Sequence, residues 1–145
     1  MTTTGSGSAE PPPAAPPRKL KRCPPGYRPD DEITRSAGSA VHIVTDPREA
    51  VAGAQAVYTD VWVSMGDEEE RSRRLADLSA YRVDAELVAL AADDAVFLHC
   101  LPAHRGEEVT AGVIDGARSA VWQQAANRLP TEQAVLFAIA TSWEG

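Results

Sequence analysis

The sequence predicts an α/β fold, a single three-layer domain built on a mostly parallel sheet. Three observations support this prediction. Short apolar runs alternate with segments of helical character from residue 25 onward. Aspartate or proline precedes several of the helical segments, and glycine follows some of them, as expected at helix ends. The chain has 145 residues, which is enough for one domain with its own core.

Four short segments are predicted as strands. Residues 56–63 are rich in β-branched and aromatic side chains, and residues 95–101 begin with an apolar run typical of a buried strand. Residues 40–45 and 120–122 have the same character over shorter lengths. Because helices separate these strands, the sheet is expected to be mostly parallel.

Six segments are predicted as helices, at residues 31–37, 47–52, 67–78, 85–92, 108–114 and 130–142. Asp46 caps the second, with Pro47 at its first position, and Asp84 caps the fourth. The third has acidic residues in its first turn and arginines in the next, which suits the helix dipole. Its predicted i,i+4 ion pairs are Asp67–Arg71 and Glu70–Arg74. The last helix carries an apolar stripe: Val135, Ala138, Ile139 and Trp143.

Residues 1–24 are predicted to be a disordered, low-complexity tail, and residues 25–145 a folded domain. Threonine, glycine and serine dominate residues 2–8, and proline dominates residues 11–17. The basic run at residues 18–22 has two interpretations, a localisation or anion-binding tag and a solvated linker. The linker is favoured, because the chain as a whole is acidic.

The composition argues against several classes of partner. Fourteen lysines and arginines against 21 aspartates and glutamates give a net charge of −7 at pH 7, which argues against nucleic acid and anionic membrane surfaces. No apolar run approaches the roughly 20 residues that span a bilayer. The N-terminus lacks the apolar core of a signal peptide, and two cysteines do not make a disulfide framework. A soluble cytoplasmic protein is therefore expected.

The most informative segment is residues 97–108, Phe-Leu-His-Cys-Leu-Pro-Ala-His-Arg-Gly-Glu-Glu. A predicted buried strand delivers His99 and Cys100 to its own end, and a polar loop follows. Strand ends followed by such loops are where open α/β sheets place their ligands. A buried thiol beside imidazoles and carboxylates is costly without a use for it. This loop is therefore the predicted functional site.

Three motifs together resemble the ornithine-binding half of ornithine carbamoyltransferases. They are Asp60-Val61-Trp62-Val63-Ser64-Met65-Gly66, His99-Cys100-Leu101-Pro102 and Asn127-Arg128-Leu129. They occur in the family's order and with similar spacing, over roughly residues 25–142. The resemblance implies the second domain of the carbamoyltransferase fold. The charged segment 19–23 lies where that domain has its first strand, and its charge argues against a strand there.

The family transfers a carbamoyl group from carbamoyl phosphate to L-ornithine, giving citrulline and phosphate, in arginine biosynthesis. Its first domain binds carbamoyl phosphate through a Ser-Thr-Arg-Thr loop, which this sequence lacks. The chain is therefore expected to be a truncated, ornithine-binding half, with an incomplete carbamoyl phosphate site. The alternative is a catalytically inactive relic, or an amino-acid-binding or interaction module. An exposed apolar face is expected where a first domain would dock, and association with such a domain or a trimer is possible.

The resemblance implies that Asp60, Ser64 and Met65 hold ornithine. Asp60 would pair with the α-ammonium, Ser64 would add a hydroxyl hydrogen bond, and Met65 would add backbone and apolar contacts. The alternative for Asp60 is a carboxylate that caps the following turn. The alternative for Ser64 is a helix N-cap. The Ser64-Met65-Gly66 sequence favours ornithine over a related amino acid.

The resemblance also implies that Cys100 and Arg128 act in catalysis and, with Leu101, contact carbamoyl phosphate. Cys100 would position or deprotonate the δ-amine, and its alternative is a small buried hydrophobe. Leu101 would offer its carbonyl, and the bond to Pro102 is a candidate for the cis form. Arg128 would bind oxygen pairs, and its alternative is a surface ion pair with Glu132.

The alternative to these roles is a zinc site made by His99, Cys100 and His104, with Glu107 or Glu108. Adjacent residues of a strand point to opposite faces, so shared ligation by His99 and Cys100 is awkward. The two histidines are better interpreted as hydrogen-bonding residues that orient the loop. No dinucleotide or phosphate-loop motif is present in the sequence. The sequence therefore predicts neither a metal nor a cofactor.

Overall fold

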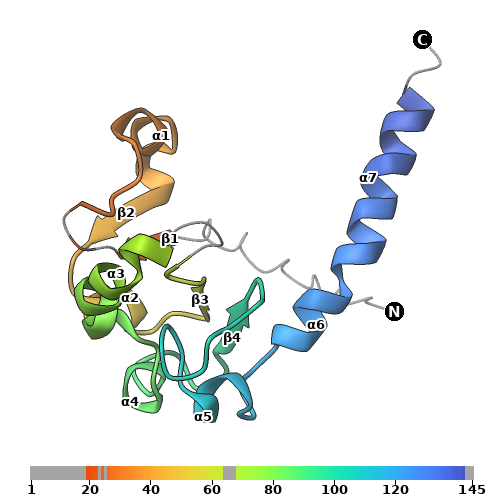
Figure 1. The fold of residues 1–145 in the computed structure, drawn as a ribbon. Helices are drawn as coiled ribbons and strands as arrows, with labels where there is room; N and C mark the ends of the chain where they lie inside the picture. Colours follow the sequence, from red (N-terminus) through yellow and green to blue (C-terminus); the bar gives the residue numbers. More distant parts are fainter. Residues whose placement is uncertain (1–18, 23, 25, 64–67, 143–145) are drawn as a thin grey trace, which may run out of the picture.

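The computed structural model describes residues 19–22, 24, 26–63 and 68–142, and strands alternate with helices along most of that length (Figure 1). The described strands are β1 (Lys19–Arg22), β2 (Val41–Val44), β3 (Ala56–Thr59) and β4 (Val96–His99). Helices α1 (Asp31–Ser36) and α2 (Pro47–Val51) separate the first three strands. The remaining helices are α3 (Arg71–Leu78), α4 (Ala85–Val88), α5 (Ala111–Ile114), α6 (Val121–Ala126) and α7 (Arg128–Ser142). The predicted α/β class is confirmed.

The strands pair in parallel, as predicted, but in two separate pairs. Strand β1 pairs with β2, with Lys19 opposite Val41, and β3 pairs with β4, with Thr59 opposite His99. An isolated parallel bridge between Phe97 and Ser119 adds one more contact to β4. Hydrogen bonds between the described strands thus join neighbouring pairs rather than one continuous sheet.

The position of β1 corrects one expectation from the sequence. The strand occupies Lys19–Arg22, inside the segment that was expected to belong to the tail. The charge of this segment was the argument against a strand. It was insufficient, because a parallel ladder is made by backbone groups and β2 supplies a complete four-residue partner. Within the described residues, regular structure is therefore already present at Lys19, ahead of residue 25.

The segment predicted as a fourth strand, residues 120–122, is a second correction. Helix α6 begins at Val121, and only Ser119 bridges to the sheet. Phe97 N–H donates to the carbonyl of Arg118 at 2.8 Å, and Ala120 N–H donates to the carbonyl of Phe97 at 2.9 Å. A three-residue apolar run cannot distinguish a strand from a helix start, and here the buried Val121 begins a helix.

The helix ends follow the predicted capping. Asp46 accepts from Arg48 N–H at 2.8 Å, with Pro47 at the start of α2, and Asp84 accepts from Leu87 N–H at 2.9 Å. The predicted third helix is a 3₁₀ turn at Glu68–Glu70 followed by α3. Its Glu70–Arg74 ion pair is present at 3.1 Å, whereas the predicted partner of Arg71 lies outside the described residues.

Asp84→Ala is expected to lower the free energy of unfolding by about 1 kcal/mol, because it removes the oxygen that satisfies the Leu87 N–H. Chemical denaturation of the two proteins measures this difference. Asp93→Ala is a matched control, because Asp93 is exposed and lies just beyond the same helix. Equal stability of the Asp84 variant and the wild type would contradict the capping role.

The core lies around β4 and the segments that pack on it. Its fully buried apolar side chains are Phe97, Ile114, Val83, Val109 and Val121. They come from a strand, two helices and two connecting segments, so the core fixes where β4 ends relative to the loop that follows it. No helix of the described residues is long and apolar enough to cross a membrane.

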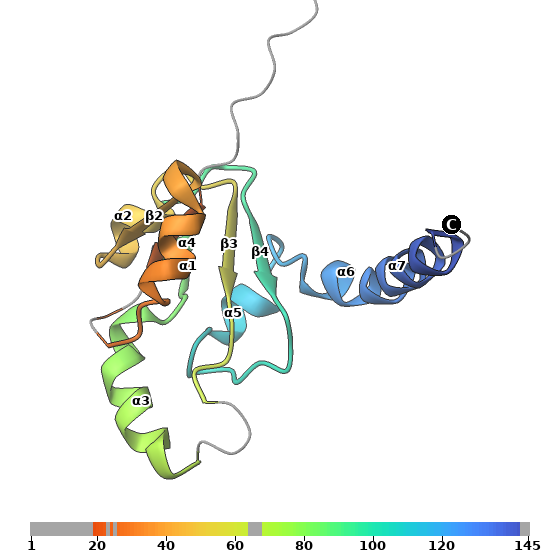
Figure 2. The same cartoon turned by 90° about the horizontal axis from the view of Figure 1, so that it is seen from above.

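Helix α7 extends away from the rest of the domain (Figures 1 and 2). No residue of this helix is buried. Its large apolar side chains are more than half exposed: Leu129, Val135, Leu136, Phe137 and Ile139. The predicted stripe is therefore only partly described, since Trp143 lies outside the described residues, and apolar side chains also lie beside it. An exposed apolar surface of this kind was expected from the sequence.

Candidate functional site

The candidate site lies where β3 and β4 end. The two strands are parallel and adjacent (Figure 2), so their carboxyl ends meet at one edge. Asp60 follows the last residue of β3, and Cys100 follows the last residue of β4. The pairing of Thr59 with His99 therefore places Asp60 and Cys100 side by side, although 40 residues separate them in sequence. This is the edge at which α/β sheets bind ligands.

The Cys100 thiol donates a hydrogen bond to Asp60 Oδ1 over 2.8 Å. Burial raises the pKa of the Cys100 thiol, and the hydrogen bond to Asp60 raises it further. Asp60 Oδ1 also accepts from the N–H of Val61 at 2.7 Å. The turn-capping role weighed for Asp60 is therefore present, and the same oxygen faces Cys100. Asp60 and Cys100, which the sequence analysis placed in one site, are thus in direct contact.

The raised pKa predicts slow alkylation of Cys100. In a Cys23→Ser background, iodoacetamide should react at pH 8 more slowly than with an unstructured cysteine peptide, because less thiolate is present. Asp60→Asn should speed the reaction, because it removes a carboxylate that disfavours the thiolate. The pH profile of the alkylation rate measures both effects. A wild-type rate profile whose midpoint pH is at or below that of the peptide would contradict the account.

Two residues that the sequence analysis missed lie beside this pair. The pKa of Tyr58 is raised, first by its hydrogen bond with Cys100 and then by burial. Gln124 on α6 accepts from the backbone N–H of His99 at 3.0 Å, which ties this helix to the end of β4. The two-residue period of a strand was a signal for Tyr58, since it shares a face with Asp60. No signal in the sequence indicated the contact of Gln124.

The loop after β4 has a specific backbone geometry. His99 is buried, and its Nδ1 accepts a hydrogen bond from the N–H of Leu101 at 2.9 Å. Leu101 has a φ of 57°, and its peptide bond to Pro102 is cis, as the sequence suggested. The predicted loop-orienting role of the His99 side chain is therefore observed. His104 differs, because its backbone N–H makes the close contact and its side chain is partly exposed.

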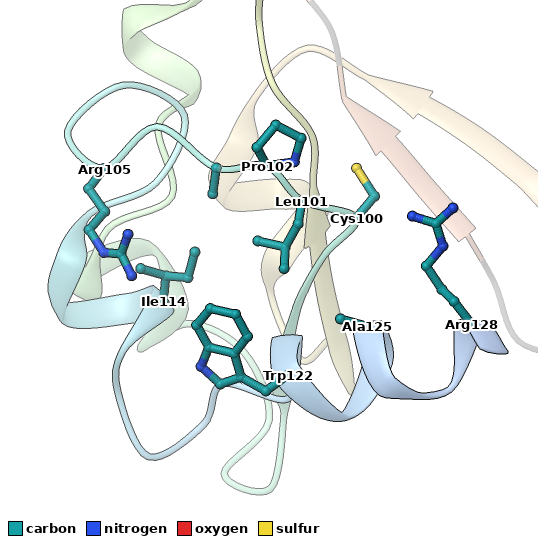
Figure 3. Close-up of a pocket in the computed structure, with 9 residues that line it drawn as sticks. Cys100, Leu101, Pro102, Arg105, Ile114, Trp122, Ala125 and Arg128 are labelled. Atoms are coloured by element: carbon teal, nitrogen blue, oxygen red, sulfur yellow. The ribbon is translucent and has the colours of Figure 1, made fainter. Parts of the chain in front are cut away.

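A pocket of about 580 Å³ opens beside this loop (Figure 3). Cys100, Leu101 and Arg128 all line it, with Trp122 of α6 on the opposite side. The Arg128 side chain leaves the start of α7 on the same side of the loop as the Cys100 sulfur. Arg128 also lies 3.7 Å from Glu132 in an exposed ion pair, which is the alternative weighed for it. The structure thus brings three of the predicted site residues to one pocket.

The two other predicted ornithine ligands, Ser64 and Met65, lie outside the described residues. The chain after them is anchored nonetheless. Arg71, at the start of α3, forms an ion pair with Glu107 of the loop that follows β4. This contact joins the segment after residues 64–67 to the candidate site.

One group in the described part of the chain has metal-ligand chemistry: His104, Glu107 and Glu108, with ligand atoms within 4.8 Å of one another. His99 and Cys100, which the sequence analysis considered as zinc ligands, are not part of this group. Glu107 already pairs with Arg71, and Glu108 Oε1 already takes two contacts from within the loop. These interactions engage Glu107 and one oxygen of Glu108, so we assign no metal to the group.

Comparison with known proteins agrees with the geometry. A sequence model described as aspartate/ornithine carbamoyltransferase, Asp/Orn binding domain, matches residues 19–139. The chain belongs to the aspartate/ornithine carbamoyltransferase family. The match begins at the first residue of β1, in line with the strand found there. The family accounts for the motifs around Asp60, Cys100 and Arg128, which all lie inside the matched range.

Individual members of this carbamoyltransferase family are similar over most of the chain. The ornithine carbamoyltransferase of Nitrosococcus oceani is 58% identical over 113 residues, which are 78% of this chain and 37% of that protein. The structure of the ornithine carbamoyltransferase from Pyrococcus furiosus matches with a TM-score of 0.76 and 42% identity, covering 83% of this chain and 41% of that one. That of the anabolic enzyme from Campylobacter jejuni matches with a TM-score of 0.79 and 31% identity, covering 86% and 44%. The chain thus spans well under half the length of these relatives.

Proposed function

We propose that this chain is the ornithine-binding half of an ornithine carbamoyltransferase. The observation that carries the proposal is the contact between the Cys100 thiol and the Asp60 carboxylate at the joined ends of β3 and β4. The reaction joins the δ-amine of L-ornithine to the carbonyl carbon of carbamoyl phosphate and releases phosphate. It requires an anchor for the amino acid, a deprotonated δ-amine and fixed donors for the developing charge.

In this proposal Asp60, Ser64 and Met65 anchor ornithine. The carboxylate of Asp60 is exposed, so an α-ammonium group can reach it. The ligand then replaces the Cys100 thiol as the partner of Asp60 Oδ1. This exchange releases the thiol to turn toward the δ-amine. Cys100 positions that amine or takes part in removing its proton, and no covalent bond to sulfur is involved.

Carbamoyl phosphate meets only part of its site in this half. Leu101 and Arg128 line the same pocket as Cys100. In this proposal the Leu101 carbonyl and the Arg128 guanidinium contact carbamoyl phosphate. A guanidinium stays charged and presents paired donors, which suits phosphate and carbamoyl oxygens. The remaining contacts come from a carbamoyl-phosphate-binding domain, in another chain or in a longer protein. Catalysis therefore needs a second domain.

The surface of α7 supports association with such a domain. Its apolar side chains are exposed along a 15-residue helix that carries no buried residue. An apolar surface of this kind on a water-soluble domain marks an interaction site. The same surface supports the alternative function, a catalytically inactive relic that binds an amino acid or a partner protein without turnover. The proposal also includes a trimer, formed once this domain has joined the carbamoyl-phosphate-binding domain.

The first test is citrulline formation by the purified chain, given carbamoyl phosphate and L-ornithine. The proposal predicts no citrulline above the uncatalysed rate. Product that disappears in Cys100→Ala and in Arg128→Ala would show that this chain carries a complete site, and the half-enzyme proposal would be wrong.

The second test separates an enzyme half from a relic. A chimera in which residues 19–139 replace the matching segment of the Nitrosococcus oceani relative should form citrulline. The same chimera carrying Cys100→Ala is the control and should be much less active. A chimera that folds, binds carbamoyl phosphate and forms no citrulline would favour the relic.

A further inference from the structure

Glu108 is a buried carboxyl group that the proposed chemistry does not use. Its side chain is completely buried, eight residues beyond Cys100 in sequence. Glu108 Oε1 lies 3.2 Å from His99 Nε2 and accepts a hydrogen bond from the N–H of His104 at 2.6 Å. Its second oxygen, Oε2, is buried without a hydrogen-bond partner. Burying a carboxyl group is costly, so a role in holding the loop is the natural explanation.

The hydrogen bonds around His99 assign its tautomer. The Leu101 N–H can only donate, so His99 Nδ1 must be the unprotonated acceptor. His99 Nε2 then carries the proton and donates it to Glu108 Oε1. A carboxylate facing Nε2 selects this tautomer, because the opposite tautomer would turn the lone pair of Nε2 toward the carboxylate. The opposite tautomer would also place an N–H against the Leu101 N–H. The acidic partner on one side of the ring thus determines the acceptor on the other.

The same oxygen holds both ends of the loop. Through His99 it acts on Leu101, whose backbone adopts a φ of 57°, and directly it holds the His104 N–H. Such a conformation is unfavourable for leucine and persists only where its surroundings impose it. Cys100 lies between His99 and Leu101, so the position of its thiol depends on the same contacts.

We propose that Glu108 is a positioning residue for the site: acting through the His99 tautomer, it fixes the Leu101 backbone and keeps the Cys100 thiol beside Asp60. The inference rests on the proposed function only where it concerns ornithine, and its structural part stands without a ligand. In this proposal the buried carboxylate acts on the site through other residues and does not contact the substrate.

Glu108→Leu is the discriminating substitution, because leucine fills most of the space but cannot accept a hydrogen bond. It leaves the His104 N–H without its acceptor and removes the partner of His99 Nε2 that selects the tautomer. Glutamine could keep both contacts through its amide oxygen, so it would not discriminate. Val109→Ala is the matched control, because Val109 is adjacent and fully buried but outside the polar contacts.

The experiment first measures the side-chain ¹⁵N shifts of His99 by NMR in the wild type. The inference predicts an unprotonated Nδ1 and a protonated Nε2, and a protonated Nδ1 would overturn it without any variant. In Glu108→Leu we expect a shift toward the opposite tautomer and at least a threefold change in the rate of Cys100 alkylation in the Cys23→Ser background. Val109→Ala should lower stability but leave the tautomer unchanged and the alkylation rate within twofold.

Ornithine binding completes the test. Glu108→Leu should weaken L-ornithine binding about tenfold, the effect of losing one buried hydrogen bond, whereas Val109→Ala should leave the affinity within twofold. If the wild type binds no ornithine, the proposed function fails while the tautomer and alkylation readouts still decide the positioning role. If Glu108→Leu keeps the wild-type tautomer and alkylation rate, the positioning role is wrong even where ornithine binds. If that variant does not fold, the tautomer of the wild type and the alkylation rate in His99→Asn decide. Asparagine keeps an acceptor for the Leu101 N–H but loses the contact with Glu108. An unchanged alkylation rate in this variant would overturn the inference.

Discussion

Asp60→Asn is expected to weaken L-ornithine binding by roughly thirtyfold or more, the largest effect of any single substitution on the ligand. The carboxylate is the proposed partner of the α-ammonium, and truncating one member of such a charge pair costs at least about 2 kcal/mol. We expect the lower end of the usual range, because Asp60 is exposed in the unliganded protein and water screens the pair. Asparagine keeps the shape of the side chain, so the effect reports charge. Isothermal calorimetry of L-ornithine measures it.

Asp77→Asn is the control for this substitution. Asp77 is an exposed residue of α3 that accepts a hydrogen bond from Tyr27, away from the candidate site. It makes the same change in net charge, so ornithine affinity should stay within twofold. Equal affinities of Asp60→Asn and the wild type would remove Asp60 from the ligand site.

Phe97→Ala is expected to lower the free energy of unfolding by about 3–5 kcal/mol, the usual cost of removing a buried aromatic side chain. Phe97 is 0% exposed at the centre of β4, and its backbone bridges to Ser119. The loss therefore combines removed apolar contacts with a cavity beneath the site. Urea denaturation followed by circular dichroism measures the difference.

Val96→Ala serves as the comparison within the same strand. Val96 is the neighbouring residue and is 39% exposed, so its truncation should cost well under half as much. A Phe97 variant that loses less than about 1 kcal/mol would show that β4 is not the centre of the core.

The meeting of Asp60 and Cys100 could be predicted from the sequence for a physical reason. Each follows a strand-like run, and parallel strands bring their carboxyl ends to one edge. The helix caps at Asp46 and Asp84 were equally predictable, because capping depends on residues within one turn of each other.

Other features depend on contacts that sequence does not contain. The charge of Lys19–Arg22 suggested a tail, but pairing with β2 makes it a strand. The apolar run at Val121 and Trp122 suggested a strand, but Ser119 already makes the sheet contact and the chain turns into a helix. Both errors arise where tertiary contacts override local preference.

The polar contacts behind the site show the same limit. Glu108 was considered only as a metal ligand, because nothing in its spacing from His99 indicates that the loop folds back to bury it. Gln124 belongs to none of the motifs, yet it holds the backbone of His99. The residues that touch a ligand can be proposed from motifs, whereas those that position them become visible in three dimensions.

The most direct test of the central claim is calorimetric titration of the unaltered chain with L-ornithine and, separately, with L-aspartate. The family model covers domains for either amino acid, and the sequence around Ser64 favours ornithine. We predict saturable binding of L-ornithine at one site and at least tenfold weaker binding of L-aspartate, because the side-chain carboxylate of L-aspartate would be repelled by the acidic Asp60. Failure to bind L-ornithine, or equal affinity for the two, would contradict the assignment of this domain as an ornithine-binding half.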